Sequence, residues 1–367
     1  MSSALTATVP IAEDTWADIR LLPKVLLHDH LDGGLRTDTI IELAEAVGYR
    51  ELPANDPDEL ADWFHKSGKG SLPRYLEAFR HTVAVMQTPQ AIERVAYEAA
   101  VDLAADGVVY AEIRMGIALL TERGLTLEEV IESIIKGFER GELETGIVAR
   151  TIVTALRHHS DSEAVASSAV KFAGRGVVGF DLAGPEADHP PEVHAAACEI
   201  ARTGGLGLTI HAGEAAGLQS MWQARLACHA QRFGHGVRII EGTRTGRGEI
   251  IELGSFARSI RDQRVPLELA MSSNVDTGTI ASLESHPVEA LLRAGFAVTL
   301  NTDNRLMSRT SMSNEFAIAH VVHGFRAAEL LAVTENALHA AFGDWPTRER
   351  LLRELVRPHF AEFTPED

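Results

Sequence analysis

Two histidines separated by one residue, His28 and His30, lie at the end of an apolar stretch near the start of the chain. Alternate residues of a strand point to the same face, so both imidazoles would lie side by side. Two ligands of one metal ion would have this arrangement. A buried histidine next to an exposed one explains this motif equally well, so the remaining polar residues must decide.

Further polar residues follow later apolar runs, namely His211 with Glu214, His235, and Asp303. A carboxylate buried there without a partner would cost several kcal/mol. Imidazole and carboxylate groups meeting at one point suit zinc. Zinc also lowers the pKa of a bound water from about 15.7 to about 7, so hydrolysis is the expected chemistry. We predict one zinc ion per chain, with four ligands: His28, His30, His211 and Asp303.

Eight short apolar runs precede these residues or lie between them, and each is typical of a strand buried on both faces. They span residues 25–33, 108–115, 147–158, 176–184, 206–214, 232–237, 266–274 and 297–303. Helical patterns separate many of them, at 37–48, 71–86, 126–141, 160–174, 190–203 and 287–295. In barrel enzymes the C-terminal strand ends form the active site, which is where the polar residues lie.

This alternation predicts an α/β protein with a (β/α)8 TIM barrel fold. The interval from Gly34 to Val108 is too long for one helix, so additional helices are expected there, over or beside the barrel mouth, and again at the C-terminus. No repeat or linker divides the chain, which favours one domain over 1–367. Within it we expect an N-terminal extension over 1–19 and a C-terminal helix over 346–367. A doubly wound sheet is the alternative, but its glycine-rich nucleotide loops are missing.

Composition restricts the classes of partner. The formal net charge is −18, which disfavours nucleic acid and acidic membrane surfaces and favours a neutral small molecule. The two cysteines are too few for a disulfide framework. Residues 1–20 lack the features of a signal peptide, and no run of about 20 apolar residues is present, so we expect a cytoplasmic protein. The oligomeric state is left open.

Several motifs resemble the adenosine deaminase family of the amidohydrolase superfamily over about residues 20–345, and an asparagine after the last ligand makes bacterial members the nearest likeness. They are HDHLDGG, GVVGFDLAGPE, TIHAGE, FGHGVRI, SSN and LNTDN, in this order. The resemblance implies hydrolytic deamination of adenosine or 2′-deoxyadenosine to inosine or 2′-deoxyinosine and ammonia, as part of purine metabolism.

The resemblance also implies roles for single residues. Glu214 would protonate purine nitrogen 1, and His235 would position and deprotonate the metal-bound water. Asp303 would belong to the catalytic set as well as to the metal site. The residues implied in substrate binding are His30, Asp32, Gly184 and Asn304. Asp181 would support the charge pattern of the site, and Ser273 would be a partner of His235.

The sequence departs from the family in two pocket segments, EIRMGIALLTERG and LELAMSSN. Loss of an aromatic residue and a proline there could widen the site. A modified adenine nucleoside or adenine is therefore an alternative substrate, although Asp32 favours a nucleoside. A non-catalytic nucleoside-binding relative is a further alternative, but no ligand, acid or base is missing.

Overall fold

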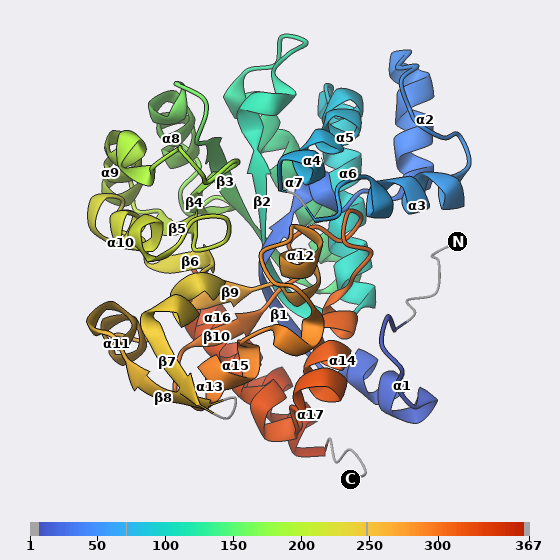
Figure 1. Ribbon diagram of the computed structural model, residues 1–367. Helices are drawn as coiled ribbons and strands as arrows, with labels where there is room; N and C mark the ends of the chain where they lie inside the picture. The colour runs from blue at the N-terminus through green and yellow to red at the C-terminus, as the bar shows by residue number, and fades with distance from the viewer. Residues whose placement is uncertain (1–6, 71, 247–248, 363–367) are drawn as a thin grey trace.

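Eight parallel strands form the centre of the protein, as a computed structural model that describes residues 7–70, 72–246 and 249–362 shows (Figure 1). The strands are β1 (Lys24–His30), β2 (Val108–Gly116), β3 (Val148–Leu156), β4 (Val177–Ala183), β5 (Gly207–Ala212), β6 (Arg232–His235), β9 (Leu267–Leu269) and β10 (Val298–Leu300). Each coincides with one of the eight predicted runs, with β1 and β2 extending one residue beyond theirs, and hydrogen bonds join the strands in the order in which they occur along the chain. The predicted (β/α)8 barrel is confirmed.

The seam between β10 and β1 closes around the predicted metal ligands. The backbone N–H of His30 donates to the carbonyl of Asp303 at 2.7 Å, and the N–H of Asp303 donates to the carbonyl of His28 at 2.9 Å. Below them the amide oxygen of Asn301 accepts from the N–H of Leu27 at 3.0 Å. Two ligand segments that are far apart in sequence are therefore joined by backbone hydrogen bonds.

Helices surround the strands and bury the outer face of the barrel (Figure 1). They include α6 (Pro89–Ala105), α7 (Leu127–Thr145), α8 (Ser162–Val170), α9 (Ala195–Thr203), α10 (Leu218–Ala227), α11 (Ser255–Asp262), α13 (Val288–Arg293), α14 (Met312–His323) and α15 (Ala327–Ala340). Local sequence determines where α7 begins and ends. Thr126 and Glu129 form a reciprocal capping box at its start, and Gly146 ends it with a φ of 79°.

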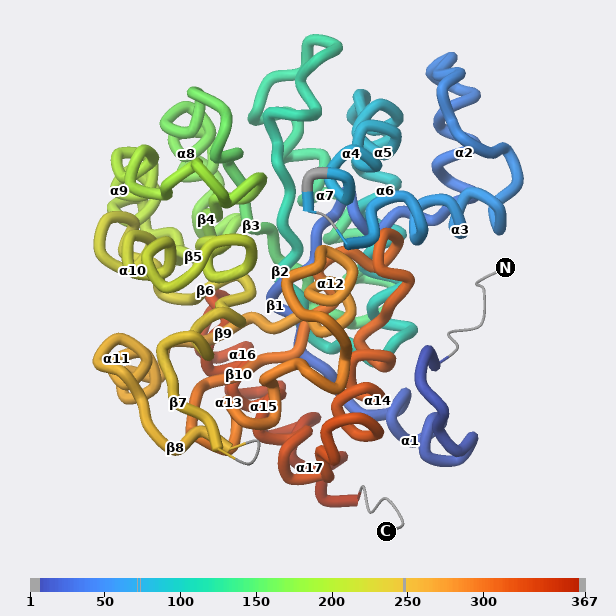
Figure 2. Tube along the Cα trace, viewed as in Figure 1, coloured from blue at the N-terminus to red at the C-terminus, as the bar shows by residue number. Residues whose placement is uncertain are grey.

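In the described part of the long interval between β1 and β2, additional α-helices precede α6, as predicted (Figure 2). These are α2 (Thr37–Val47), α3 (Pro57–Ser67), α4 (Leu72–Glu77) and α5 (Phe79–Val85). The predicted single helix over 71–86 is wrong, since α4 and α5 are separate, and Ser71 lies outside the described residues. Side chains of α4 and α5 contribute to the wall of the large cavity described below.

Three further details differ from the sequence prediction. The run 266–274 contains a strand of three residues, and α12 (Met271–Asp276) begins directly after it. The antiparallel hairpin of β7 (Thr243–Gly246) and β8 (Glu249–Leu253) was not predicted, because its strands are short and largely polar. In the described part of the C-terminal segment, helical structure is continuous but divided into α16 (Trp345–Leu351), a π-helical stretch (Leu352–Val356) and α17 (Arg357–Glu362).

The barrel interior contains charged side chains as well as apolar ones. Arg114, Arg232 and Glu268 are at most 1% exposed, and Glu268 contacts both guanidinium groups, with N–O distances of 2.8 Å to Arg114 and 2.7 Å to Arg232. Pairing of this kind offsets the several kcal/mol that desolvation of each ion costs. Among the described residues, no helix has the length and apolar character needed to cross a membrane.

Packing of α7 against α6 gives a prediction about stability. A Cβ added at Gly137 would lie 2.4 Å from the carbonyl oxygen of Glu93 and 2.5 Å from the Cβ of Ala96, so the two helices would have to separate. We expect Gly137→Ala to lower the free energy of unfolding by about 1–3 kcal/mol. Urea unfolding monitored by circular dichroism measures this change. Glu132→Ala, at an exposed position of α7, is the matched control, and equal stability of the two variants would contradict the packing argument.

Candidate active site

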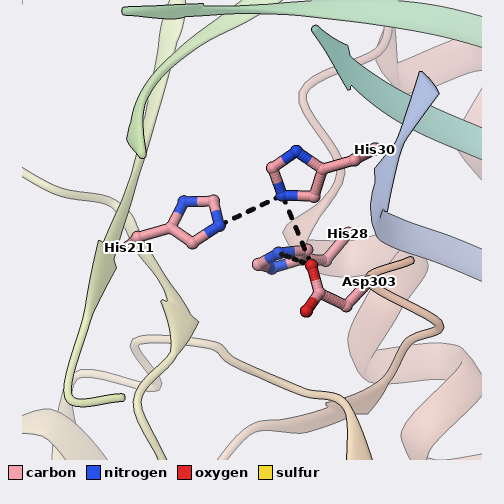
Figure 3. A group of neighbouring side chains, drawn as sticks. All are labelled: His28, His30, His211 and Asp303. Atoms are coloured by element: carbon pink, nitrogen blue, oxygen red, sulfur yellow. Dashed lines mark hydrogen bonds and ion pairs between the residues drawn. The ribbon is translucent and has the colours of Figure 1, made fainter. Parts of the chain in front are cut away.

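Four ligand atoms from His28, His30, His211 and Asp303 lie within 4.8 Å of one another (Figure 3). The Nε2 atoms of His30 and His211 are 3.2 Å apart. Oδ1 of Asp303 lies 3.2 Å from Nε2 of His28 and 3.3 Å from Nε2 of His30. The structure therefore brings together all four residues that the sequence analysis predicted as ligands.

The cluster and its neighbour His235 are positioned by the carboxyl ends of three strands and by the segment after β10, which carries Asp303. His28 and His30 lie on β1, His211 lies on β5, and His235 ends β6. Asp303 and His235 both have left-handed backbones, with φ values of 58° and 64°. Non-glycine residues adopt this conformation at an energetic cost, and strained residues of this kind are enriched at functional sites.

The hydrogen bonds around the cluster are consistent with a bound cation. Nδ1 of His28 donates to Glu268 at 3.0 Å, and Nδ1 of His211 donates to Asp181 at 3.1 Å, so the Nε2 atoms keep their lone pairs. Nε2 of His28 is buried and has no hydrogen-bond partner among the described residues. Metal–ligand bonds of about 2.0–2.2 Å would separate ligand atoms by about 3.3–3.6 Å, close to the shorter separations seen here.

The pKa shifts of three of the four ligands, His28, His30 and Asp303, also fit a cation. Burial, together with the nearby Arg114 guanidinium, lowers the pKa of His28 to about 4, so its imidazole is neutral near pH 7. Burial also places the pKa of His30 well below its usual value. For Asp303 burial opposes ionisation, but the contact with His28 and the other nearby imidazoles hold its pKa well below the usual value. The cluster thus presents His28 and His30 with lowered pKa values beside one carboxylate. For His211 burial opposes protonation, but the Asp181 carboxylate raises its pKa above the usual value.

Glu214 and His235 lie beside the cluster, on the loop after β5 and at the end of β6. Oε2 of Glu214 is 3.7 Å from Nε2 of His235, and both side chains are at least 94% buried. Burial raises the pKa of Glu214, and the negative charge of Asp303 adds to this effect, although His235 opposes it. A carboxyl group with a raised pKa can remain protonated at higher pH, as a general acid requires.

Glu186 holds the backbone of the Glu214 loop, a role that the sequence analysis did not assign. One carboxylate oxygen accepts from the N–H of Gly213 at 2.8 Å, and the other accepts from the N–H groups of Glu214, Ala215 and Ala216 at 3.0, 2.7 and 2.8 Å. Its side chain is 4% exposed. The only signal in the sequence was its place in the motif DLAGPE.

A buried ionic network lies below the metal ligands and orients them. Most of its residues were not predicted from the sequence. The Arg114 guanidinium contacts Glu268 at 2.8 Å and Asp181 at 3.3 Å, and these two carboxylates accept from His28 and His211. Thr209 also donates to Glu268, at 2.9 Å. The predicted supporting role of Asp181 agrees with these contacts. Charged letters within the apolar runs EIRM and LEL were the available signal for Arg114 and Glu268.

The predicted contact between Ser273 and His235 is wrong. The hydroxyl of Ser273 donates instead to Asp303, while the side-chain amide of Asn274 lies 3.0 Å from Nδ1 of His235. A strand, with side chains alternating between two faces, was expected here, but Met271–Asp276 forms the short helix α12, in which each residue is rotated by about 100° from the one before it. His286, which was not among the predicted site residues, contacts the amide of Asn274 at 3.1 Å.

A cavity of about 530 Å³ opens onto the cluster, which is a suitable size for a small-molecule ligand. All four predicted substrate-binding residues line it: His30, Asp32, Gly184 and Asn304. Oδ1 of Asp32 and Oδ1 of Asn304 are buried and lack a hydrogen-bond partner within the described part of the chain. Gly184 has a φ of 94°, a conformation that glycine adopts without strain. Leu119 and His158 contribute to the wall.

Comparisons with known proteins agree with this geometry. A family model described as adenosine deaminase matches residues 23–358. The chain is 49% identical to the adenosine deaminase of Mycobacterium tuberculosis strain H37Rv over 356 residues, which cover 95% of this chain and 98% of that protein. The adenosine deaminase of Mycobacterium ulcerans is also 49% identical, over 94% of this chain and 96% of that protein.

Solved structures show the same fold. An adenine deaminase from Arthrobacter aurescens is 25% identical and superimposes with a TM-score of 0.81, covering 93% of this chain and 98% of that one. An amidohydrolase from Burkholderia ambifaria with bound zinc is 24% identical, with a TM-score of 0.83 over 98% of this chain and 96% of that one. The protein is a metal-dependent hydrolase by fold and site, and the chain belongs to the adenosine deaminase family.

Proposed function

We propose that this protein converts adenosine and 2′-deoxyadenosine to inosine and 2′-deoxyinosine, with release of ammonia. The observation that carries the proposal is the presence of a four-residue ligand cluster, a buried acid and a buried imidazole in one cavity. The similarity to curated adenosine deaminases at 49% identity supports the same substrate.

His28, His30, His211 and Asp303 would hold one zinc ion. Such an ion supplies hydroxide at neutral pH by lowering the pKa of a water molecule. The zinc reported in the related amidohydrolase structure supports this choice of metal. Glu268 and Asp181 accept hydrogen bonds from Nδ1 of His28 and His211. The Nε2 lone pairs of these two histidines would therefore be directed at the ion.

Glu214 is proposed as the acid that protonates purine nitrogen 1. Burial raises its pKa, which favours the protonated form that this step requires. Protonation of nitrogen 1 draws electrons from carbon 6 and makes this carbon more susceptible to attack by hydroxide. His235 lies across from Glu214 and is placed to orient the attacking oxygen.

The substrate contacts are proposed from the cavity wall. Asp32 would bind a ribose hydroxyl, and burial raises its pKa to about 7. The backbone N–H of Gly184 would donate to purine nitrogen 3, and Asn304 would donate to nitrogen 7. An amide donates a hydrogen bond without first taking up a proton, unlike a carboxylate. His30 would contribute to substrate binding as well as to the metal site.

The first test is the substitution Glu214→Gln. The amide keeps the shape of the side chain but cannot transfer a proton, so we expect kcat for adenosine to fall by about 10²–10⁴-fold with zinc content unchanged. Ammonia release from adenosine, 2′-deoxyadenosine, 5′-substituted adenosines and adenine measures activity and substrate preference together. Glu252→Gln, on the exposed strand β8, is the control. Absence of ammonia from the wild-type protein with every adenine compound would refute the proposed function.

Metal content gives a second test. We expect one zinc per chain by atomic emission, loss of turnover after chelation, and recovery when zinc is returned. His28→Ala removes one imidazole ligand and should lower zinc occupancy, whereas His359→Ala, at an exposed position near the C-terminus, should not. Zinc should also raise the melting temperature of the wild-type protein, because a ligand that binds only the folded state stabilises it. Full occupancy in His28→Ala would contradict the assignment.

Glu186→Gln gives a third test, of the loop that carries Glu214. The replacement removes a charge and directs an amide N–H₂ at backbone N–H groups, so at least one of four hydrogen bonds is lost. Small displacements of a catalytic group cost about 10²-fold, and we expect a decrease in kcat of this order with KM little changed. Steady-state kinetics with adenosine measures the effect. Glu192→Gln, at an exposed position of the same connection between β4 and β5, is the control. An unchanged kcat would remove Glu186 from the mechanism.

A further inference from the structure

We propose that Asn274 and His286 act as positioning residues that hold the neutral form of His235 in one tautomer, with its ring proton on Nε2 and directed into the cavity. In that tautomer His235 donates a hydrogen bond to the reacting oxygen and cannot accept a proton from it at the same nitrogen. The inference rests on the proposed deaminase function, but the tautomer itself can be measured without turnover.

The argument begins at a backbone amide, because a backbone N–H can only donate. The N–H of Val288 donates to Nδ1 of His286 at 3.2 Å, so this nitrogen carries a lone pair. Burial, together with the neighbouring imidazoles of His323 and His235, lowers the pKa of His286 to about 3. The ring is therefore neutral near pH 7 and has a single proton, which must be on Nε2.

The proton on His286 determines the orientation of the amide of Asn274. Nε2 of His286 lies 3.1 Å from Oδ1 of Asn274, and an N–H at this position requires an acceptor. The reversed amide would direct its N–H₂ at another N–H, which would leave both donors unpaired. The usual ambiguity between the nitrogen and the oxygen of an asparagine side chain is thus removed by its neighbour.

The oriented amide in turn determines the tautomer of His235. Nδ2 of Asn274 lies 3.0 Å from Nδ1 of His235 and can only donate, so Nδ1 accepts and the ring proton of neutral His235 is on Nε2. The side chains of Asn274, His235 and His286 are 0%, 1% and 3% exposed, so bulk water does not compete for these bonds. The proton on His286 thus orients the amide of Asn274, and this amide determines which nitrogen of His235 carries the proton.

The protonated Nε2 of His235 faces the reaction site. It lies 3.7 Å from Oε2 of Glu214 and 4.0 Å from Oδ2 of Asp303. A donor held here before the reaction can stabilise negative charge on the oxygen that adds to carbon 6. The family resemblance assigned His235 the removal of a proton from water, but a nitrogen that already carries a proton does not perform this step.

The hydrogen-bonded series Val288–His286–Asn274–His235 forms a relay, and the substitution Asn274→Asp tests this relay most directly. A carboxylate accepts at both oxygens, so it would favour the proton on Nδ1 of His235 and leave a lone pair on Nε2. We expect the tautomer to reverse and kcat to fall by about 10²-fold, as when one preorganised donor is lost, with KM little changed. Asn55→Asp makes the same chemical change at an exposed position before α3, outside the relay and the site, and should leave both the tautomer and kcat unaltered.

The measurement is ¹⁵N NMR of the full-length, zinc-loaded protein labelled at histidine, with the His235 signals assigned by their loss in His235→Gln. In the wild type we expect Nε2 to show the shift of a protonated ring nitrogen and Nδ1 that of an unprotonated one. Asn274→Asp should exchange the two shifts. The opposite pattern in the wild type, or full kcat in an Asn274→Asp protein whose tautomer has reversed, would overturn the inference.

A second pair of variants covers the case in which Asn274→Asp does not fold. His286→Phe removes the donor to Asn274 and should give a mixture of His235 tautomers with reduced kcat. His286→Gln restores an amide donor and should recover the single tautomer and most of the activity. A single His235 tautomer in His286→Phe would overturn the proposed role of His286. A wild-type protein that shows the expected ¹⁵N shifts but releases no ammonia would refute only the proposed function.

Discussion

The backbone seam between β1 and the segment after β10 is the constraint on which the rest of the site depends. Two hydrogen bonds join Asp303 to His28 and His30, and they fix three ligand residues relative to one another before any side chain is considered. The left-handed backbone of Asp303 turns its carboxylate toward the two imidazoles. The lone pairs of these three side chains are thereby crowded together, and a bound cation would relieve this crowding. Metal binding and folding would therefore stabilise each other.

Charge buried below the ligands is the second constraint. Arg114 lies between Glu268 and Asp181, and each of these carboxylates accepts from the Nδ1 of a ligand histidine. The arrangement satisfies ions that would otherwise be costly to bury, and it determines which nitrogen of each ring faces the site. Strand β2, which contributes no metal ligand, therefore still controls the orientation of two of them.

The two groups that face each other across the reaction site are held by different means. Glu186 fixes the loop of Glu214 through four backbone N–H groups, whereas His235 contacts the side chain of Asn274. Both supports are buried, so neither the acid nor the imidazole must reorganise against water during the reaction. Catalysis by groups arranged in advance depends on this type of rigidity.

The sequence by itself determined the barrel and the ligand set, because period, apolar runs and strand-end residues are local properties and because all strand ends of a parallel barrel meet at one face. His28, His30, His211 and Asp303 could be selected on that basis alone. The hydrogen-bond partners of the site residues could not be predicted in this way. Whether Ser273 or Asn274 contacts His235 depends on a helical turn that replaces a strand, and the role of Glu186 depends on the neighbouring loop. These contacts join residues that are far apart in sequence, and only the register and adjacency of the packed strands bring them within hydrogen-bonding distance.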